Sequence, residues 1–319
     1  MNLMLKQRHK NNSHKIFKSC DFHAEKNIIK KIGINNFTYN DDQINFLEIG
    51  INTASKLSTV SPTYKEELKY EYYGKNLTYS LFKRERDFYG ILNGISSSFN
   101  PDKDKSLKKR YSINTIKDKA INKIFLQNKM GLPPGEEKFV IGVVSRIVEQ
   151  KGFDLILSSF DSLLENKNIQ FVLLGAGDER YIEELRKLEF RHPDQIKLNI
   201  GYDATNPNYI YGGADVFLMP SRFEPCGLGQ MIALKYGTLP IVRQTGGLND
   251  TVTRYDHLTN KGNGFTFGNY DSFEMKNVIE EAYNLFENNK EAWNILIKRA
   301  MKSDNSLTKS TQKYIELYK

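Results

Sequence analysis

The 319-residue sequence has little cysteine and no long apolar run. Its two cysteines, Cys20 and Cys226, form no Cys-x-x-Cys pair, so neither a disulfide framework nor a zinc finger is indicated. No stretch approaches the ~18 consecutive apolar residues of a membrane-spanning helix, and the opening "MNLMLKQRHK" lacks the apolar centre of a signal peptide. These absences predict a cytoplasmic protein with no membrane partner.

Two common nucleotide-binding motifs are also missing. "GAGDER" would match Gly-x-Gly-x-x-Gly only if Arg180 were glycine, so the dinucleotide fingerprint fails. The only Gly-Lys pair, Gly74-Lys75, has no glycine five residues before it, which excludes a P-loop. A nucleotide site of another kind stays open.

The charge balance is basic, with 46 Lys and Arg against 38 Asp and Glu and a net charge of +8. The lysines are spread along the chain and do not gather on one stripe, which argues against a nucleic-acid partner. The length suggests about two domains of ~150 residues each. The composition, 39% hydrophobic, is sufficient for sizeable cores.

From Phe139 onward, apolar runs alternate with amphipathic segments. The runs predict buried strands at residues 139–145, 170–177, 196–202, 215–220, 238–243 and near 264–268. The amphipathic segments predict helices at residues 153–166, 179–190, 228–237 and 271–288. This alternation predicts an α/β fold, with right-handed βαβ units that build an open parallel sheet.

The first third of the chain is less regular. Residues 56–62 and 89–94 look like strands, the polar stretch 100–110 looks like a linker, and 121–133 should be a helix that enters a second domain. We therefore expect three parts: a partial N-terminal domain (1–110), a nucleotide-sugar-binding Rossmann-like domain (111–305), and a C-terminal helix that returns to the N-terminal domain (306–319).

Polar and glycine-bearing turns follow each predicted strand of the second domain. "SRIVEQKG" carries Arg146 and Lys151, "SRFEPCGLG" carries Glu224, and "RQTGGLNDT" carries Gly246 and Gly247. Ligands of open parallel sheets bind beyond the carboxyl ends of the strands. We therefore expect these turns to lie along one rim and to share a ligand.

The residue types on this rim suit a phosphorylated sugar. Arg146 can hold phosphate oxygens with two N–H groups, and Lys151 adds a point charge. The glycines let backbone amides approach an anion closely. Glu224 suits sugar hydroxyls, and Tyr202 could stack on a base. Taken singly, each feature has a plainer structural explanation, such as a solvated charged loop or, for Cys226, a small buried side chain; their occurrence on one rim favours the ligand.

The block "SRFEPCGLGQMIALKYGTLPIVRQTGGLNDTV" closely resembles the signature of bacterial glycogen synthases and plant starch synthases. "VVSRIVEQKGFDLI", "LLGAGDERY" and "GGADVFLMPSRFEPCG" fit the same family in order, and "INFLEIGINTASKLSTVSPTYKEEL" matches its N-terminal domain. The resemblance implies the GT-B glycosyltransferase fold, with two Rossmann-like domains, here a complete C-terminal one and a truncated N-terminal one. It implies retaining transfer of glucose from ADP-glucose to the non-reducing end of an α-1,4-glucan, without metal or cofactor.

The resemblance also assigns roles to the rim. Arg146, Lys151 and Glu224 would be the catalytic residues. The two cations would neutralise the donor diphosphate, and Glu224 would hold glucose hydroxyls. The residues it places in substrate binding are Tyr202 beside adenine, Cys226, Gly227 and Leu228 in the sugar wall, and Thr245, Gly246 and Gly247 as phosphate-binding amides. His14 stands at the spacing of a family histidine near the transferred sugar, but its neighbours differ from the family pattern.

The sequence departs from the family at its N-terminus. No Lys-x-Gly-Gly-Leu loop occurs before Thr245, which is expected to impair activity of this chain alone. The alternatives are therefore a non-catalytic ADP- or glucan-binding remnant, or one half of a split synthase with a separately encoded N-terminal fragment. A GT-B transferase with a different acceptor is a third possibility.

Overall fold

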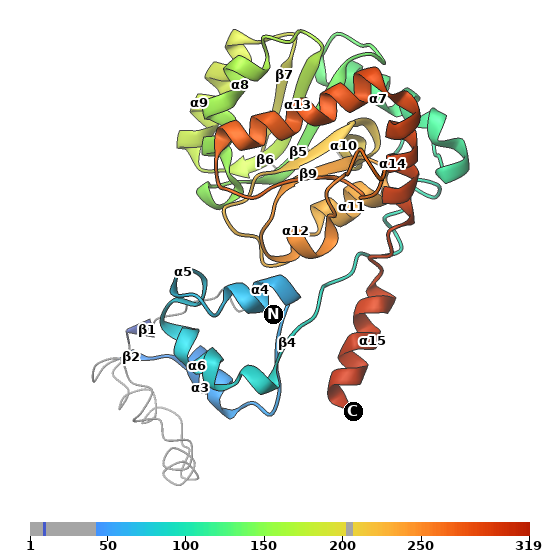
Figure 1. The fold of residues 1–319 in the computed structure, drawn as a ribbon. Coiled ribbons are helices and arrows are strands. Elements are labelled where there is room, and N and C mark those ends of the chain that lie inside the picture. The colour runs from blue at the N-terminus through green and yellow to red at the C-terminus, as the bar shows by residue number, and fades with distance from the viewer. Residues whose placement is uncertain (1–8, 11–42, 202–206) are drawn as a thin grey trace. The chain divides into compact units, whose positions relative to one another are not determined.

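The computed structural model of the chain describes residues 9–10, 43–201 and 207–319. The chain divides into two compact units, Met1–Leu92 and Asn93–Lys319 (Figure 1). Each unit has its own secondary structure and its own core, and we describe them separately.

The first unit contains a short parallel pair of strands, β3 (Leu57–Thr59) and β4 (Phe88–Gly90). A strand thus lies within the predicted range 56–62, and the other overlaps only the first two residues of the predicted range 89–94. A second pair, β1 (His9–Lys10) and β2 (Gln43–Ile44), is antiparallel. The helical elements are α3 (Phe46–Thr53), α4 (Pro62–Glu67), α5 (Glu71–Gly74), η2 (Lys75–Leu77), α6 (Thr78–Lys83) and η3 (Glu85–Asp87).

A small hydrophobic cluster holds this first unit together. Its buried members come from α3, α4, α6 and the strand β4, together with the segments that join them: Ile51, Tyr64, Leu68, Leu77, Leu81 and Phe88. Ser61 begins α4 by accepting a hydrogen bond from the Tyr64 amide, which satisfies one of the free amides at the helix start. Apolar burial and one helix cap therefore account for the local fold.

The second unit is built on a six-stranded sheet in which every strand pair is parallel. The strands are β5 (Phe139–Ile147), β6 (Ile169–Gly177), β7 (Ile196–Ile200), β8 (Val216–Met219), β9 (Leu239–Arg243) and β10 (Phe265–Phe267). All six predicted strands are confirmed. Strands buried on both faces read as continuous apolar runs, and this is why the sequence pattern was sufficient here.

The spatial order of the strands is β10-β9-β8-β5-β6-β7. This is the order of the dinucleotide-binding doubly wound fold, in which the chain moves outward from the first strand in one direction and then in the other. The reversal places β5 beside β8, and the helices that follow these two strands, α8 (Phe153–Leu163) and α11 (Gly229–Lys235), belong to different layers. A ligand crevice is expected there.

Helices cover the two faces of this sheet (Figure 1). In one layer α8 contacts α9 and α13, and in the other α10 contacts α7 and α11. The helical elements of the unit are η4 (Ile113–Asp118), α7 (Lys119–Met130), η5 (Glu149–Lys151), α8 (Phe153–Leu163), α9 (Glu179–Arg191), α10 (Asn208–Gly213), α11 (Gly229–Lys235), α12 (Gly246–Thr251), α13 (Ser272–Asn288), α14 (Lys290–Lys302) and α15 (Leu307–Tyr318).

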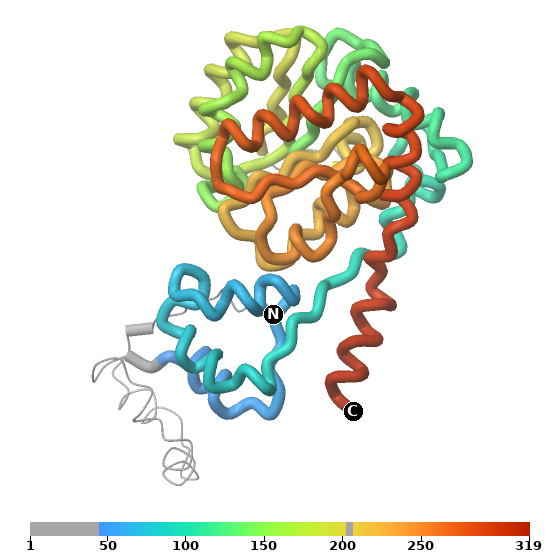
Figure 2. Tube along the Cα trace, in the orientation of Figure 1, coloured from blue at the N-terminus to red at the C-terminus, as the bar shows by residue number. Residues whose placement is uncertain are grey.

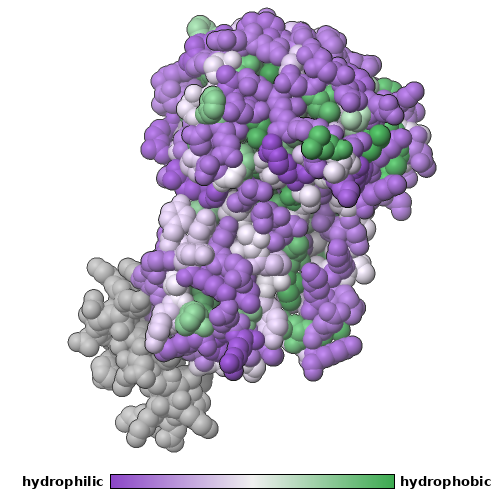
Figure 3. Space-filling model, in the orientation of Figure 1, coloured by the Kyte–Doolittle hydropathy of each residue, from purple (hydrophilic) through white to green (hydrophobic). Residues whose placement is uncertain are grey.

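Segments distant in the sequence lie side by side in this unit. The red tube of α14 runs next to the teal tube that carries η4 and α7 (Figure 2). The visible face of the unit is mostly hydrophilic, with small separate apolar areas (Figure 3). Among the residues that the structure describes, no helix is long and apolar enough to cross a membrane.

The stretch 100–110, expected to be a linker, is packed into the second unit. The Asp104 carboxylate accepts hydrogen bonds from the Tyr236 hydroxyl (2.6 Å) and the Asn208 amide (2.8 Å). The Tyr111 side chain is buried, and its hydroxyl donates to the Tyr236 carbonyl at 2.7 Å. The division between the units therefore lies at residues 92 and 93 instead of after residue 110. A polar composition concealed these specific buried partners.

The C-terminal helix α15 begins at a serine cap, where the Lys309 amide donates to the Ser306 side chain. Ser306 also forms a parallel bridge with Ile95, which ties the start of the helix to the start of the second unit. The expected return of this helix to the N-terminal domain stays a prediction.

Replacing Asp104 with alanine should destabilise the second unit by about 2–3 kcal/mol, because the buried Tyr236 hydroxyl and the Asn208 amide lose their charged acceptor. Chemical denaturation followed by circular dichroism measures this. Asp102→Ala is the control, since Asp102 is exposed in the same turn. Equal stability of the two variants would show that the Asp104 contacts contribute nothing.

Candidate functional site

The loops that follow β5 and β8 touch through their backbones. The Arg222 amide donates to the Gln150 carbonyl (2.9 Å), and the Gln150 side chain donates to the Phe223 carbonyl (3.0 Å). Gly152 has a φ of +78°, and a Cβ there would lie 2.1 Å from the Pro220 carbonyl oxygen. Only glycine fits this position without strain. These hydrogen bonds and this close approach hold the two loops together at the switch point of the sheet.

Lys151 and Glu224, one from each of these loops, form an ion pair. The Glu224 residue is only 7% exposed, and its carboxylate also accepts from the Ser221 hydroxyl at 3.2 Å. A buried carboxylate requires such partners because desolvation strongly disfavours an isolated charge. Two of the three charged residues that the sequence placed on the rim therefore contact each other.

A cavity of about 220 Å³ opens between these loops. Five of the predicted site residues line it: Arg146, Lys151, Glu224, Gly227 and Leu228. Two cations and one carboxylate face the same space, so the cavity carries a positive excess. This combination suits an anion that is attached to a hydrogen-bonding group such as a sugar.

The glycine pair after β9 packs against the loop that carries Glu224. A Cβ on Gly246 would lie 1.9 Å from the Glu224 carbonyl oxygen, and a Cβ on Gly247 would lie 2.1 Å from that of Cys226. The Gly247 amide donates to the Glu224 carbonyl at 3.1 Å. Gly247 therefore positions Glu224, a role that the sequence did not indicate. The predicted phosphate contacts of Thr245, Gly246 and Gly247 stay predictions.

Sequence reasoning missed an arginine that fixes the start of the Glu224 loop. The Arg243 guanidinium is buried at the end of β9 and donates to the Ser221 (2.9 Å) and Arg222 (2.5 Å) carbonyls. Arg222 in turn stacks on the Tyr270 ring, 4.3 Å from its centroid. Tyr270 donates to Asp154 at 2.5 Å, and burial followed by that hydrogen bond raises the pKa of its hydroxyl. No local pattern signals this network, because its members are far apart in the sequence.

A second missed residue supports the Cys226–Gly227 turn. Gln230 is fully buried, and its amide donates to the carbonyls of Cys226 (3.0 Å) and Gly227 (3.1 Å). The Cys226 thiol is itself buried, and burial raises its pKa to about 11. The thiol therefore stays protonated at neutral pH. Cys226 packs as a small buried side chain, which the sequence analysis gave as its plainer explanation. Gly227, at a φ of +70°, allows the turn.

Two predicted site residues, His14 and Tyr202, lie outside the described residues. Within the described part of the chain, no group of three or more His, Cys, Asp or Glu side chains is arranged to hold a metal ion.

Comparison with known proteins agrees with this geometry. Residues 126–307 match the family model "Glycosyl transferases group 1", and residues 6–83 match "Starch synthase catalytic domain". The first match covers more than half of the chain and includes every residue that lines the cavity. The chain belongs to the group 1 glycosyl transferase family.

Individual relatives refine this placement. The chain is 46% identical over 281 residues to a glycogen synthase of Acholeplasma laidlawii, and 46% identical over 278 residues to one of Clostridium novyi. Each match covers 87% of this chain but only 59% and 58% of the relative. The chain thus spans somewhat more than half the length of the curated relatives it matches. The resemblance to glycogen and starch synthases is confirmed.

A solved structure is similar as well. The catalytic domain of starch synthase IV from Arabidopsis thaliana, bound to ADP and acarbose, superposes with a TM-score of 0.82 at 37% identity. The superposition covers 88% of this chain and 58% of that one. The GT-B fold predicted for this chain is therefore confirmed.

Replacing Gly246 with alanine should lower the free energy of unfolding by about 2–4 kcal/mol. A positive φ costs an alanine about 1–2 kcal/mol, and the clash with the Glu224 carbonyl adds to it. Denaturant titration measures the change. Gly131→Ala is a matched control, because Gly131 also has a positive φ (+72°) but has no atom within 4 Å of the added Cβ. A Gly246→Ala effect no larger than that of Gly131→Ala would contradict the close packing.

Proposed function

We propose that this chain transfers glucose from ADP-glucose to the non-reducing end of an α-1,4-glucan, with retention and without a metal ion. The observation that carries the proposal is the convergence of Arg146, Lys151 and Glu224 on one cavity at the switch point of the sheet. The glycogen synthases at 46% identity supply the substrate class. The cytoplasmic location is part of the same proposal.

The chemical demand on the site is stabilisation of a leaving group. When the bond between the sugar and the diphosphate breaks, negative charge accumulates on the departing ADP. Cations fixed beside that position lower the barrier because they need no rearrangement at the moment of reaction. We assign this task to Arg146 and Lys151, which reach the cavity from the loop after β5.

Glu224 has two tasks in this proposal. It holds the Lys151 ammonium at the cavity, and its carboxylate can accept hydrogen bonds from sugar hydroxyls. The glycine pair 246–247 fixes the backbone that carries it. Gly227 and Leu228 line the same cavity and would form the adjoining sugar wall, and Cys226 immediately precedes them in the chain.

A second candidate function is binding of ADP or glucan without turnover, either alone or as one half of a split synthase. The observation in its favour is that the chain spans 59% of the length of its glycogen synthase relative. Incorporation of radiolabelled ADP-glucose into glycogen distinguishes the two functions. Label incorporated by the chain alone supports transfer, whereas ADP binding with no incorporation supports the second function. A preference for UDP-glucose would instead indicate a transferase with another donor.

Lys151→Ala should weaken ADP binding by roughly 1–3 kcal/mol, because a charge-assisted contact is lost and Glu224 is left without its cation. Isothermal titration calorimetry gives the affinity. Lys187→Ala is the control, since Lys187 is an exposed lysine on α9 whose side chain pairs with Glu184. An unchanged ADP affinity in a folded Lys151→Ala protein would remove Lys151 from the donor site.

A further inference from the structure

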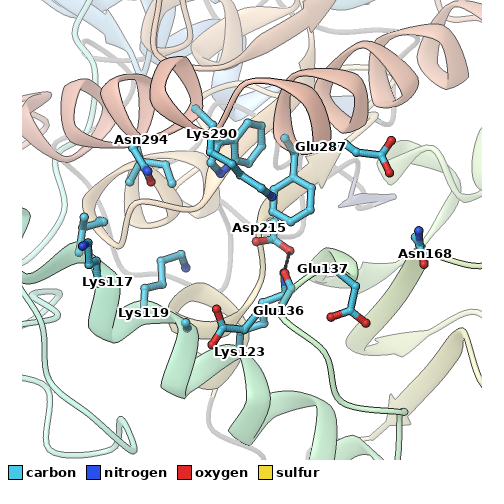
Figure 4. A pocket seen from close by; sticks show the side chains of 16 residues that line it. Lys117, Lys119, Lys123, Glu136, Glu137, Asn168, Asp215, Glu287, Lys290 and Asn294 are labelled. Atoms are coloured by element: carbon cyan, nitrogen blue, oxygen red, sulfur yellow. Dashed lines mark hydrogen bonds and ion pairs between the residues drawn. The ribbon is translucent and has the colours of Figure 1, made fainter.

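Two cavities of the second unit differ in whether their buried polar groups are already bonded within the protein. The larger cavity, of about 670 Å³, lies at the amino end of β8, and lysines and carboxylates share its walls (Figure 4). Its buried charges are engaged: Lys123 pairs with Asp215 at 2.8 Å, and Lys119 donates to the Thr238 hydroxyl at 2.7 Å. These groups therefore do not select a ligand. The cavity at the switch point differs in this respect.

The cavity at the switch point lies where β5 and β8 separate before they end. The two strands pair at only two residues of each, 141–142 and 216–217. Beyond these pairs β5 continues to Ile147 beside β6, and β8 continues to Met219 beside β9. The facing edges of β5 and β8 are therefore not paired with each other over this stretch. The residues of the two strands that line the cavity are Val143, Val144, Ser145, Arg146, Leu218 and Met219.

Side chains from both helix layers reach this gap between β5 and β8. Phe153 and Ile156 come from α8 in one layer, and Tyr211 comes from α10 in the other. Phe153, Ile156 and the strand residues Val143 and Leu218 are at most 3% exposed. The inner wall of the cavity is therefore apolar, and Tyr211 adds a hydroxyl to it.

The Tyr211 side chain is buried, and the residue is only 5% exposed. Its ring packs against Phe217 and Tyr236, with centroids 5.0 Å and 6.2 Å away, and its carbonyl accepts from the Thr238 hydroxyl at 2.6 Å. Within the described chain the Tyr211 hydroxyl forms no hydrogen bond, although its oxygen is not completely enclosed by protein. A buried tyrosine hydroxyl normally has a partner. The cavity that Tyr211 lines is where that partner would bind.

Glu224 offers a second unengaged atom at the same cavity. The Lys151 ammonium and the Ser221 hydroxyl both donate to the Glu224 Oε2 atom. The Oε1 atom has no hydrogen bond from the residues that the structure describes. A carboxylate oxygen only accepts, whereas a tyrosine hydroxyl both donates and accepts. Together they match a ligand whose hydroxyl groups do both, as those of a sugar do.

The cations of the cavity lie toward its mouth. Arg146 is exposed and Lys151 is half-buried, whereas Tyr211 and the wall beside it are buried. A diphosphate is costly to bury against apolar side chains, so it would stay beside the two cations. The cavity volume of about 220 Å³ is below the ~300 Å³ at which sites for drug-sized ligands begin. The inner part therefore suits one sugar ring and not a whole nucleotide.

We propose that Tyr211 is a further substrate-binding residue, whose hydroxyl hydrogen-bonds the hexose of the sugar nucleotide in the gap between β5 and β8. The inference rests on the proposed function, in which the donor is ADP-glucose. The diphosphate binds at Arg146 and Lys151, and Glu224 Oε1 accepts from a second hydroxyl of the hexose. Burial raises the pKa of the Tyr211 hydroxyl, so it keeps its proton at neutral pH and can donate.

Tyr211→Phe tests this assignment, because it removes the hydroxyl and keeps the ring that packs on Phe217 and Tyr236. Isothermal titration calorimetry on the full chain, without glucan so that no transfer occurs, gives the affinities for ADP-glucose and for ADP. The variant should bind ADP-glucose about three- to tenfold more weakly, since one neutral hydrogen bond is lost. Its affinity for ADP should equal that of the unmodified chain, because ADP lacks the hexose.

Tyr255→Phe is the matched control. Tyr255 is 4% exposed, its hydroxyl also forms no hydrogen bond within the described chain, and it lines neither cavity. This variant should bind both ligands as the unmodified chain does. Thermal unfolding followed by circular dichroism verifies that both variants are folded.

Three results would overturn the inference. An unchanged ADP-glucose affinity in folded Tyr211→Phe would show that the hydroxyl does not contact the ligand. An equal loss of affinity for ADP and ADP-glucose would place the hydroxyl at the diphosphate. If the unmodified chain bound neither ligand, the proposed function would fail and this inference with it. That last result needs no variant, so the two failures are distinguishable.

Discussion

The candidate donor site depends on how closely three loops approach one another at the carboxyl edge of the sheet. Gly152, Gly246 and Gly247 each stand where a Cβ would lie about 2 Å from a backbone carbonyl oxygen of residues 220–226. Backbone cannot yield as a side chain can, so these contacts hold the loop after β8 in one position. The position of this loop determines where Glu224 lies, and the ion pair then holds the Lys151 ammonium beside the Glu224 carboxylate. Fixed charges of this kind are what stabilisation of a leaving group requires.

The sequence predicted the second unit well because its strands are buried on both faces. Runs such as "FVIGVV" and "FVLLG" leave little choice of structure, and the parallel arrangement then places the following loops on one rim. Arg146, Lys151 and Glu224 could be grouped on that basis alone. The family resemblance added their roles, and the geometry brings the three to one cavity.

What the sequence could not predict depends on partners distant along the chain. Arg243 ends an apolar run, and nothing in the local sequence shows that it donates to the carbonyls of residues 221 and 222. Asp104 looked like part of a polar linker, yet it accepts from Tyr236, 132 residues away. Nothing in the local sequence shows that the buried Lys119 donates to Thr238 or that Lys123 pairs with Asp215. The composition of a segment indicates whether its side chains prefer water. It does not show which distant hydrogen-bond partner holds a particular polar side chain inside the protein.

Strand β8 runs from the amino end of the sheet, where Asp215 lies, to the carboxyl end, where the candidate donor site lies. Asp215 immediately precedes it, and the loop that carries Glu224 follows it. Four residues at about 3.3 Å each give a rigid spacer of ~13 Å, hydrogen-bonded to β5 and β9 on its two sides. A strand held in this way fixes the distance between the residues at its two ends, although no side chain contacts both ends. Asp215 and Glu224, each the carboxylate of an ion pair, therefore lie beyond the two ends of one strand.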